Sequence, residues 1–361
     1  MPEQAGETTL DTFDGLIEWS RLNDWIATQE IAGQDIAGTG PVTGVRKLSG
    51  GLQNAIFLLN RDGADIVLRR PSKNLKPKSN ETMLREARIL RALEGSAVPH
   101  PHLYAACADE SVIGACFYLM APLEGIAKSG PLEGQYASDP KWRWAMGEEL
   151  VKAAVALGEL DYAALGLADL GRPDNWHARQ VERWRSQLEG YATAMPAYNP
   201  ADLPHFAEIG RWLSDNIPDN QRIGIVHGDY QFPNVMFSLK APRISGVLDW
   251  ELASLGDPLL DLGWILSSWW EEGDPEGKGP MVQPWDGFMS RADLIDLYGA
   301  LSGRDMACIP WYSALACYKL ACLLEGTTAA WKAGKVPDKV GESVHAYATW
   351  LMAKARQVIA F

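Results

Sequence analysis

Residues 223–266 read IGIVHGDYQFPNVMFSLKAPRISGVLDWELASLGDPLLDLGWIL, and this segment is the most informative part of the sequence. An apolar strand at 224–226 leads into His227 and Asp229, and Asn234 follows. The strand is expected to present these polar side chains at its end. Taken singly, Asp229 and Asn234 are each better explained as turn residues, because Asp and Asn are favoured in turns.

A second β unit follows directly. Apolar runs at 235–237 and 244–248 flank a polar turn, and the second run delivers Asp249. Carboxylate and amide oxygens are ligands that Mg²⁺ prefers, and a further carboxylate off the metal can orient an attacking hydroxyl. Phosphoryl transfer needs this combination of positioning and charge neutralisation. The sequence therefore predicts that Asp229, Asn234 and Asp249 meet around a divalent ion.

The segments HGDYxxxN and LDWE resemble the aminoglycoside phosphotransferase family, relatives of the protein and choline kinases. The longer string VLDWELASLGDPLLDLGW, together with RQVERW at 179–184 and CYKLACLLEG at 317–326, is similar to a branch related to domains fused to acyl-CoA dehydrogenases. The similarity runs from about residue 15 to 345. It implies an α+β, bilobal, protein-kinase-like fold, with a small β-rich N-terminal lobe containing one helix and a larger, mainly helical C-terminal lobe.

The resemblance also implies roles for the residues quoted above. Asp229 would orient or deprotonate an acceptor hydroxyl, Asn234 and Asp249 would hold Mg²⁺, and the donor would be ATP. We expect His227 to brace the catalytic loop. Asp257 and Asp261 are expected to cap or brace the loop that follows the metal aspartate.

Nucleotide contacts are expected in the first lobe. Glycines let backbone amides approach phosphates closely, so Gly50 and Gly51, followed by Asn54, are candidates to cover the triphosphate. A plain Gly-Gly hairpin is the alternative. In the strand Ile66–Arg70, two-residue periodicity places Arg69 on the same face as Val67, and Arg70 on the opposite face. By the resemblance, Arg69 occupies the position of the lysine that usually pairs with the phosphates. Glu86 is the expected partner of Arg69, unless both are solvated surface charges.

Residues 117–123, FYLMAPL, resemble the hinge between the two lobes of the family. Met120 would lie behind the adenine, and the backbone of Ala121 and Leu123 would recognise its edge. An ordinary core strand that ends at Pro122 explains the same letters.

Hydrophobic periodicity supplies the remaining elements. We predict a leading amphipathic helix around 16–26, a hairpin with an Asp-Gly turn at 62–63, a helix at 81–93, and one or two strands within 112–119. Largely helical regions follow at 141–192 and 293–358. The predicted domains are 1–121, the nucleotide-binding lobe with the leading helix, and 122–361, the catalytic and acceptor-binding lobe.

Residues 271–287 are rich in Gly, Pro and acids and are predicted to form a long surface loop that holds little core material. Trp285 within this loop is a candidate contact for the acceptor, which makes the loop a candidate lid.

Composition excludes several classes of protein. The 361 residues carry 46 acidic and 33 basic side chains, a net charge of −13, so nucleic acid and anionic membranes are not expected partners. The five cysteines form no CxxC pair and lie among apolar residues, as reduced core thiols do. The first 15 residues lack the pattern of a signal peptide, and we expect a cytoplasmic protein. The sequence leaves the oligomeric state open.

The favoured function is an ATP- and Mg²⁺-dependent transfer of the γ-phosphate to a hydroxyl of a small molecule. The branch resemblance favours a hydroxylated metabolite or hydroxyacyl compound over an aminoglycoside as acceptor. A catalytically silent, kinase-like nucleotide-binding protein is the alternative. A protein kinase is disfavoured, since no glycine follows Asp249 in the DFG manner and no APE segment is present.

Overall fold

The computed structural model describes residues 16–360 with the exception of 32, 49–53, 128 and 220. The chain separates into two compact units. The N-terminal unit comprises Met1–Glu124 and Ser245–Glu251, and the C-terminal unit comprises Gly125–Ile244 and Leu252–Phe361. The first unit is rich in strands and the second is mainly helical, as the sequence predicts.

A five-stranded sheet in the order β1-β2-β3-β5-β4 forms the centre of the N-terminal unit. The Asp62-Gly63 turn joins β2 to β3 with positive φ at both residues, which is the geometry that an Asp-Gly hairpin requires. The elements of this unit are α1 (Trp19–Ile31), β1 (Gly44–Leu48), β2 (Asn54–Arg61), β3 (Ala64–Pro71), α2 (Ser79–Leu93), β4 (Leu103–Cys107), β5 (Phe117–Met120) and most of β9 (Ile244–Val247).

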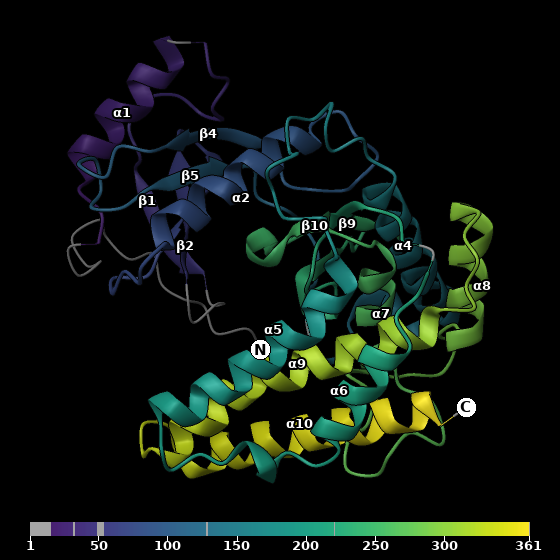
Figure 1. The fold of residues 1–361 in the computed structure, drawn as a ribbon. Helices are drawn as coiled ribbons and strands as arrows, with labels where there is room; N and C mark the ends of the chain where they lie inside the picture. Colours follow the sequence, from purple (N-terminus) through teal and green to yellow (C-terminus); the bar gives the residue numbers. More distant parts are fainter. Residues whose placement is uncertain (1–15, 32, 49–53, 128, 220, 361) are drawn as a thin grey trace. The chain divides into compact units, whose positions relative to one another are not determined.

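The two helices of this unit use different residues of the sheet. The core cluster that includes Leu22 and Ile26 of α1 also contains Ile66 and Leu68 of β3. Strand side chains alternate between faces, so Val67 and Arg69 point to the other side. The amphipathic α2 buries Met83, Glu86, Ala87, Ile89, Leu90 and Leu93. Figure 1 shows α2 lying along β5 and β4.

One sequence expectation for this unit is only half right. The strand predicted within 112–119 begins at Phe117, and residues 111–115 form turns. Gly114 has a φ of 78°, a left-handed conformation that ends any extended run. Val112 and Ile113 are nevertheless buried in the core cluster, which explains the apolar letters without a strand.

The C-terminal unit is built around a long, buried helix, α9, which packs against α10, α7 and α5. Figure 1 shows α9 and α10 side by side. The helices of this unit are α3 (Gly134–Ser138), α4 (Pro140–Gly158), α5 (Trp176–Ala194), α6 (Phe206–Asp215), α7 (Leu259–Ser268), α8 (Arg291–Ser302), α9 (Ile309–Lys332) and α10 (Asp338–Ile359). In the part of the chain that the structure describes, no helix is long and apolar enough to span a membrane.

Short strands and turns of 3-10 helix support the loops of the C-terminal unit. Strand β7 pairs antiparallel with β10, and β6 pairs parallel with β11. Their bounds are β6 (Gly130–Pro131), β7 (Gly224–Val226), β8 (Val235–Phe237), β10 (Ser254–Gly256) and β11 (Val282–Gln283), with 3-10 turns at Pro200–Asp202 and Phe232–Asn234. A further 3-10 turn, Trp250–Leu252, begins in the N-terminal unit and ends at the first residue of the returning chain. All five thiols are free, and four of them are buried, as predicted.

Candidate active site

Strand β3 delivers two adjacent arginines to opposite faces of the sheet. Arg70 donates to the backbone carbonyls of Leu16 and Ile113, on the side of α1, so its guanidinium serves the fold. Arg69 points the other way, into ion pairs with two carboxylates. Arg69 and Arg70 thus lie on the opposite faces that the periodicity of the strand predicts, and the nucleotide role of Arg69 stays a prediction.

The guanidinium of Arg69 lies between Glu86 and Asp249. Its Nη2 is 3.1 Å from Glu86 Oε2 and 2.7 Å from Asp249 Oδ1. Tyr118 on β5 also donates its hydroxyl to Glu86 Oε2, at 3.1 Å. Helix α2 thus supplies the partner that the sequence predicts for Arg69, and Asp249 shares the same cation.

Burial raises the pKa of Glu86 to about 7, against the opposing effect of the Arg69 charge. The Glu86 side chain is 1% exposed, and its Oε1 has no hydrogen-bond partner among the described residues. The Arg69–Glu86 pair is therefore fully charged only near or above neutral pH.

Asp249 has an unusual backbone conformation, with a φ of 64°. Left-handed backbone is uncommon outside glycine and clusters at functional positions. The Asp249 side chain is 37% exposed, in contrast to the buried Arg69 and Glu86. One carboxylate oxygen meets Arg69, so this side chain keeps an exposed portion that a ligand can reach.

The predicted hinge follows β5 directly. Met120, the last residue of β5, is buried, and the Ala121 N–H donates to the His102 carbonyl at 2.8 Å. The Ala121 carbonyl and the Leu123 N–H are then the groups suited to an adenine edge, since Pro122 lacks an N–H. Leu123 packs on Gly246 of β9: a Cβ added at Gly246 would lie 2.3 Å from Leu123 Cδ1.

Two of the predicted phosphate contacts, Gly50 and Gly51, fall outside the described residues. Asn54 is described and opens β2 opposite Pro71 at the end of β3. The proposed covering of the triphosphate by this turn stays a prediction.

The predicted catalytic loop follows β7 and is held by side-chain amides. Asp229 Oδ1 accepts from Gln231 Nε2 at 2.6 Å, and Asp229 Oδ2 accepts from Asn234 Nδ2 at 2.7 Å. Asn234 also donates to the Asp229 carbonyl, at 2.9 Å. The carboxylate is half-buried and fixed in orientation, as a residue that must orient a hydroxyl should be.

His227 and Asp261 brace this loop from within. The Asp229 N–H donates to His227 Nδ1 at 3.3 Å, and the carboxylate of Asp261 accepts the N–H of His227 at 2.7 Å and of Gly228 at 2.9 Å. His227 and Asp261 are both buried, and neither is placed to meet a substrate. The bracing roles predicted for them agree with these contacts.

The residues proposed for Mg²⁺ have suitable chemistry. The amide nitrogen of Asn234 faces Asp229, which leaves its Oδ1 oxygen as the group that can ligate a cation. Asp249 offers a partly exposed carboxylate. Among the described residues, no group of three or more His, Cys, Asp or Glu forms a metal site by itself.

Asn234 and Asp229 belong to the C-terminal unit, and Asp249 belongs to the N-terminal unit. The convergence of the three side chains on one ion is therefore still a prediction.

A family model described as the phosphotransferase enzyme family matches residues 44–289. The chain belongs to this family. A candidate aminoglycoside phosphotransferase from Ralstonia eutropha JMP134 is 30% identical in sequence, with a TM-score of 0.75 and 94% and 98% of the two chains covered. Macrolide 2′-phosphotransferase from Brachybacterium faecium is 19% identical, with a TM-score of 0.58 and coverage of 91% and 97%, and shows the fold. The fold is therefore the predicted α+β, kinase-like fold.

Curated relatives of this phosphotransferase carry a different name. Acyl-CoA dehydrogenase family member 11 of Homo sapiens is 31% identical over 284 residues, which cover 76% of this chain and 35% of that protein. The Gallus gallus protein is 32% identical over 319 residues, which cover 84% of this chain and 38% of that protein. The chain spans about a third of the length of these relatives. Family and structural neighbours together support a small-molecule phosphotransferase, and the branch resemblance is confirmed.

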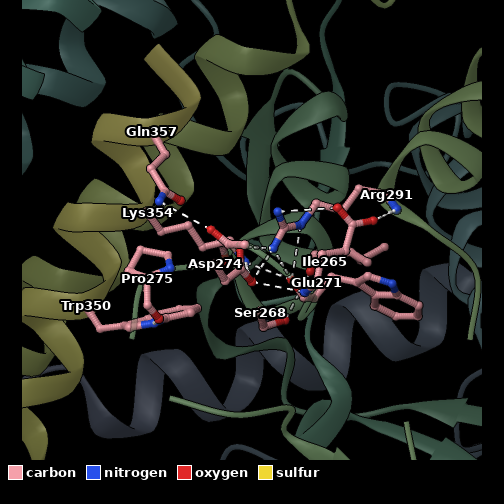
Figure 2. Close-up of polar contacts among 12 residues, drawn as sticks. Ile265, Ser268, Glu271, Asp274, Pro275, Arg291, Trp350, Lys354 and Gln357 are labelled. Carbon is pink, nitrogen blue, oxygen red and sulfur yellow. Dashed lines mark hydrogen bonds and ion pairs between the residues drawn. The ribbon is translucent and has the colours of Figure 1, made fainter. Parts of the chain in front are cut away.

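The loop 271–287 of the phosphotransferase differs from its prediction. It was expected to hold little core material, yet Val282 is fully buried in β11 and the Asp274 side chain is 2% exposed. Figure 2 shows Asp274 between Arg291 of α8 and Lys354 of α10. Asp274 Oδ2 lies 2.5 Å from Arg291 Nη2 and 3.4 Å from Lys354 Nζ. Composition misled here, because an acid counts as a surface residue until its partners, distant in sequence, are known.

Trp285 ends this loop in an aromatic cluster. Its ring stacks on Phe288 with centroids 4.3 Å apart and meets Trp269 edge-on at 5.2 Å. Trp269 in turn stacks on Phe232, at 5.3 Å. Phe232 begins the 3-10 turn that carries Asn234, so the aromatic cluster connects the loop 271–287 with the catalytic loop.

Sequence reasoning missed three supporting residues: Tyr118, Gln231 and Lys319. Tyr118 and Gln231 contact Glu86 and Asp229 and lie in segments that had been singled out for other residues. Lys319 lies in the buried helix α9 and donates to the carbonyl of Gly228. A lone lysine inside the apolar run CYKLACLL is the signal that could have revealed it, because such a charge needs a buried partner.

Proposed function

We propose that this phosphotransferase uses ATP and Mg²⁺ to transfer the γ-phosphate to a hydroxyl group of a small molecule. The carrying observation is Asp229: a half-buried carboxylate, fixed by Gln231 and Asn234 on a loop that ends a buried strand. Neighbours of the same fold include aminoglycoside phosphotransferase APH(4)-Ia in a ternary complex with ADP and hygromycin B. That neighbour supports a nucleotide and a hydroxylated acceptor for this chain too.

Each named residue has one task in the proposed reaction. The acceptor oxygen forms a bond to the γ-phosphorus, the bond from the γ-phosphorus to the β–γ bridging oxygen breaks, and ADP leaves. The hydroxyl proton passes to the carboxylate of Asp229. Arg69, held by Glu86, pairs with the α- and β-phosphates, and the hinge residues Ala121 and Leu123 recognise the base. Asn234 and Asp249 would hold Mg²⁺, which would neutralise the charge of the phosphates.

We further propose that the acceptor is a hydroxylated acid or hydroxyacyl compound and not an aminoglycoside. The acyl-CoA dehydrogenase names of the curated relatives support an acyl group. The aromatic cluster of Phe232, Trp269, Trp285 and Phe288 reaches from the catalytic loop to the loop 271–287, and its two half-buried rings, Trp285 and Phe288, offer apolar surface.

The test is a Mg²⁺-dependent screen of γ-phosphate transfer. Hydroxylated acids and their CoA esters are compared with aminoglycosides and amino alcohols, using wild-type protein and the Asp229→Ala and Asp229→Asn variants. We expect transfer to a hydroxyacyl compound by wild-type protein, none by either variant, and near-normal ATP affinity in both variants.

Each other outcome removes one part of the proposal. Preferred transfer to aminoglycosides overturns the acceptor, and wild-type turnover by Asp229→Asn overturns the mechanism. Binding of ATP–Mg²⁺ without turnover across the whole panel favours a silent nucleotide-binding protein.

A further inference from the structure

Helix α9 buries a lysine in the centre of the C-terminal unit. Lys319 is 6% exposed, and its neighbours Tyr318, Leu320 and Ala321 are buried too. An ammonium group in such surroundings is strongly unfavourable unless it is bonded and its charge is compensated. The contacts of this ammonium therefore indicate why the chain keeps it.

Three groups surround the ammonium of Lys319. It donates a hydrogen bond to the carbonyl of Gly228. It also lies over two indole rings, 5.1 Å from the ring centroid of Trp264 on α7 and 5.4 Å from that of Trp184 on α5. Cation–π contacts of this kind compensate part of the lost hydration. Four segments of the unit thus meet at one cation beneath the catalytic loop.

The bonded carbonyl belongs to the peptide unit that joins Gly228 to Asp229. The N–H of that same peptide, on Asp229, donates to His227 Nδ1. Lys319 and His227 therefore hold the two ends of one peptide group, and Asp261 holds the two preceding N–H groups. Because this peptide carries the Cα of Asp229, its orientation sets the direction of the catalytic carboxylate.

The position of Gly228 leaves little freedom for compensation. Its φ is 80°, and an added Cβ would lie 2.7 Å from the Leu252 carbonyl and 3.3 Å from Lys319 Nζ. A residue with a side chain therefore does not fit here, and Gly228 lies in close packing with both the Leu252 carbonyl and the ammonium. The geometry couples the place of the lysine closely to that of Asp229.

We propose that Lys319 is a positioning residue for phosphoryl transfer, which orients Asp229 through the Gly228 carbonyl and supplies a positive charge beneath the catalytic loop. This inference rests on the proposed role of Asp229.

The charge of Lys319 is expected to be lost in an accessible pH range. Burial lowers its pKa to about 8; the charges of Asp229 and Asp261 oppose the shift, and Arg183 on α5 adds to it. Since the ammonium form is the one that donates to the Gly228 carbonyl and offsets the carboxylates, the transfer rate should fall as pH rises through about 8.

The experiment compares Lys319→Met and Lys319→Arg with wild type over pH 6.5–9.5, in saturating ATP–Mg²⁺ and with the best acceptor from the screen. Lys319→Met should lower kcat by roughly 30-fold or more, leave the KM for ATP within about threefold, and lack the alkaline decline near pH 8. Lys319→Arg should recover part of kcat and stay flat through pH 9, because arginine stays charged.

Lys354 provides a matched control. It too is a buried lysine, with a pKa lowered to about 8 by burial, a backbone acceptor in the Trp269 carbonyl, and an indole ring, that of Trp350, at 5.0 Å. Its contacts are in the network of Figure 2 and not in the catalytic loop. Lys354→Met should therefore lose stability and retain both kcat and the alkaline decline.

Wild-type kcat with an unchanged alkaline decline in Lys319→Met would overturn the inference. If that variant does not fold, Lys319→Arg decides: an alkaline decline that persists near pH 8 also overturns it. Activity that survives in Asp229→Asn would instead remove the proposed function itself, so the two failures are distinguishable.

Discussion

The two units hold their reactive groups in different ways. In the N-terminal unit, Arg69 pairs directly with Glu86 and with Asp249, so the charged groups satisfy one another. In the C-terminal unit, Asp229 is held by the neutral amides of Gln231 and Asn234. The charged side chains of Lys319 and Asp261 bond the backbone of its loop and not its carboxylate. In the proposed reaction, a nucleotide and its metal would compete for the first set of charges, whereas Asp229 would accept the proton of a hydroxyl. The first unit is thus expected to respond mainly to ligands, and the second mainly to packing.

Beyond the Asp229 variants, the largest effect on transfer is expected from Asp249→Asn. The amide keeps the size of the side chain and tolerates a positive φ, but it removes the charge that is proposed to hold Mg²⁺ and that pairs with Arg69. We expect kcat/KM to fall by roughly 10³-fold, because a bound metal contributes several kcal/mol to the transition state. A Mg²⁺ titration of the residual activity should show a higher half-saturating concentration. An unchanged Mg²⁺ dependence would contradict the metal role of Asp249.

A brace in the C-terminal unit should matter next. Asp261→Ala leaves the N–H groups of His227 and Gly228 without their acceptor. Two unsatisfied buried N–H groups cost about 3 kcal/mol together, and we expect kcat to fall by roughly 10–100-fold. Denaturant unfolding and steady-state kinetics measure the two effects. Asp261→Asn, which retains an acceptor oxygen, should recover part of both, and equal losses in the two variants would contradict the bracing role.

A comparison of the motif residues with Lys319 shows how far the sequence alone can be interpreted. Asp249 and Asp229 follow short strands within one motif, so local pattern predicts them, and Arg69 follows from strand periodicity. The role of Lys319 depends on a contact 91 residues away, and no local pattern contains that information. Asp274 was misjudged for the same reason, since its partners lie 17 and 80 residues away. The role of a residue whose partners are distant in sequence becomes visible only when the packing of the chain is known.

A smaller and pH-dependent effect is expected from Glu86→Gln. Glu86 has a folded-state pKa of about 7 against an ordinary value of 4.5, so the folded state binds its proton more tightly. The free energy of unfolding of the wild-type protein should therefore fall as pH rises from about 4.5 to about 7. The KM for ATP should fall over the upper part of this window, as the pair with Arg69 becomes charged.

In Glu86→Gln both slopes should flatten, and the KM for ATP at pH 8 should rise by a few-fold because Arg69 loses a charged partner. Denaturant unfolding and ATP kinetics at pH 5.5–8 provide the measurement. A variant that retains the wild-type slopes would show that another group titrates.

The smallest effect on transfer is expected from Asp274→Asn, which leaves two cations near each other without their carboxylate. We expect about 3 kcal/mol of lost stability, an unchanged kcat and ATP KM, and a few-fold rise in the acceptor KM as the loop 271–287 loosens. Glu182→Gln is the control, because the side chains of its pair with Arg185 are 60% and 56% exposed and the loss should stay below about 1 kcal/mol. Equal changes in the acceptor and ATP KM would remove the loop from acceptor binding.

The positive φ of Asp249 has a practical consequence for protein engineering. Glycine adopts this conformation without strain, so Asp249→Gly would relieve roughly 1 kcal/mol of backbone energy. Random mutagenesis that ranks clones by heat resistance alone would favour this relief of strain, although the variant lacks the carboxylate that is proposed to hold Mg²⁺. Thermostable libraries of this protein should therefore be sorted by turnover as well as by melting temperature.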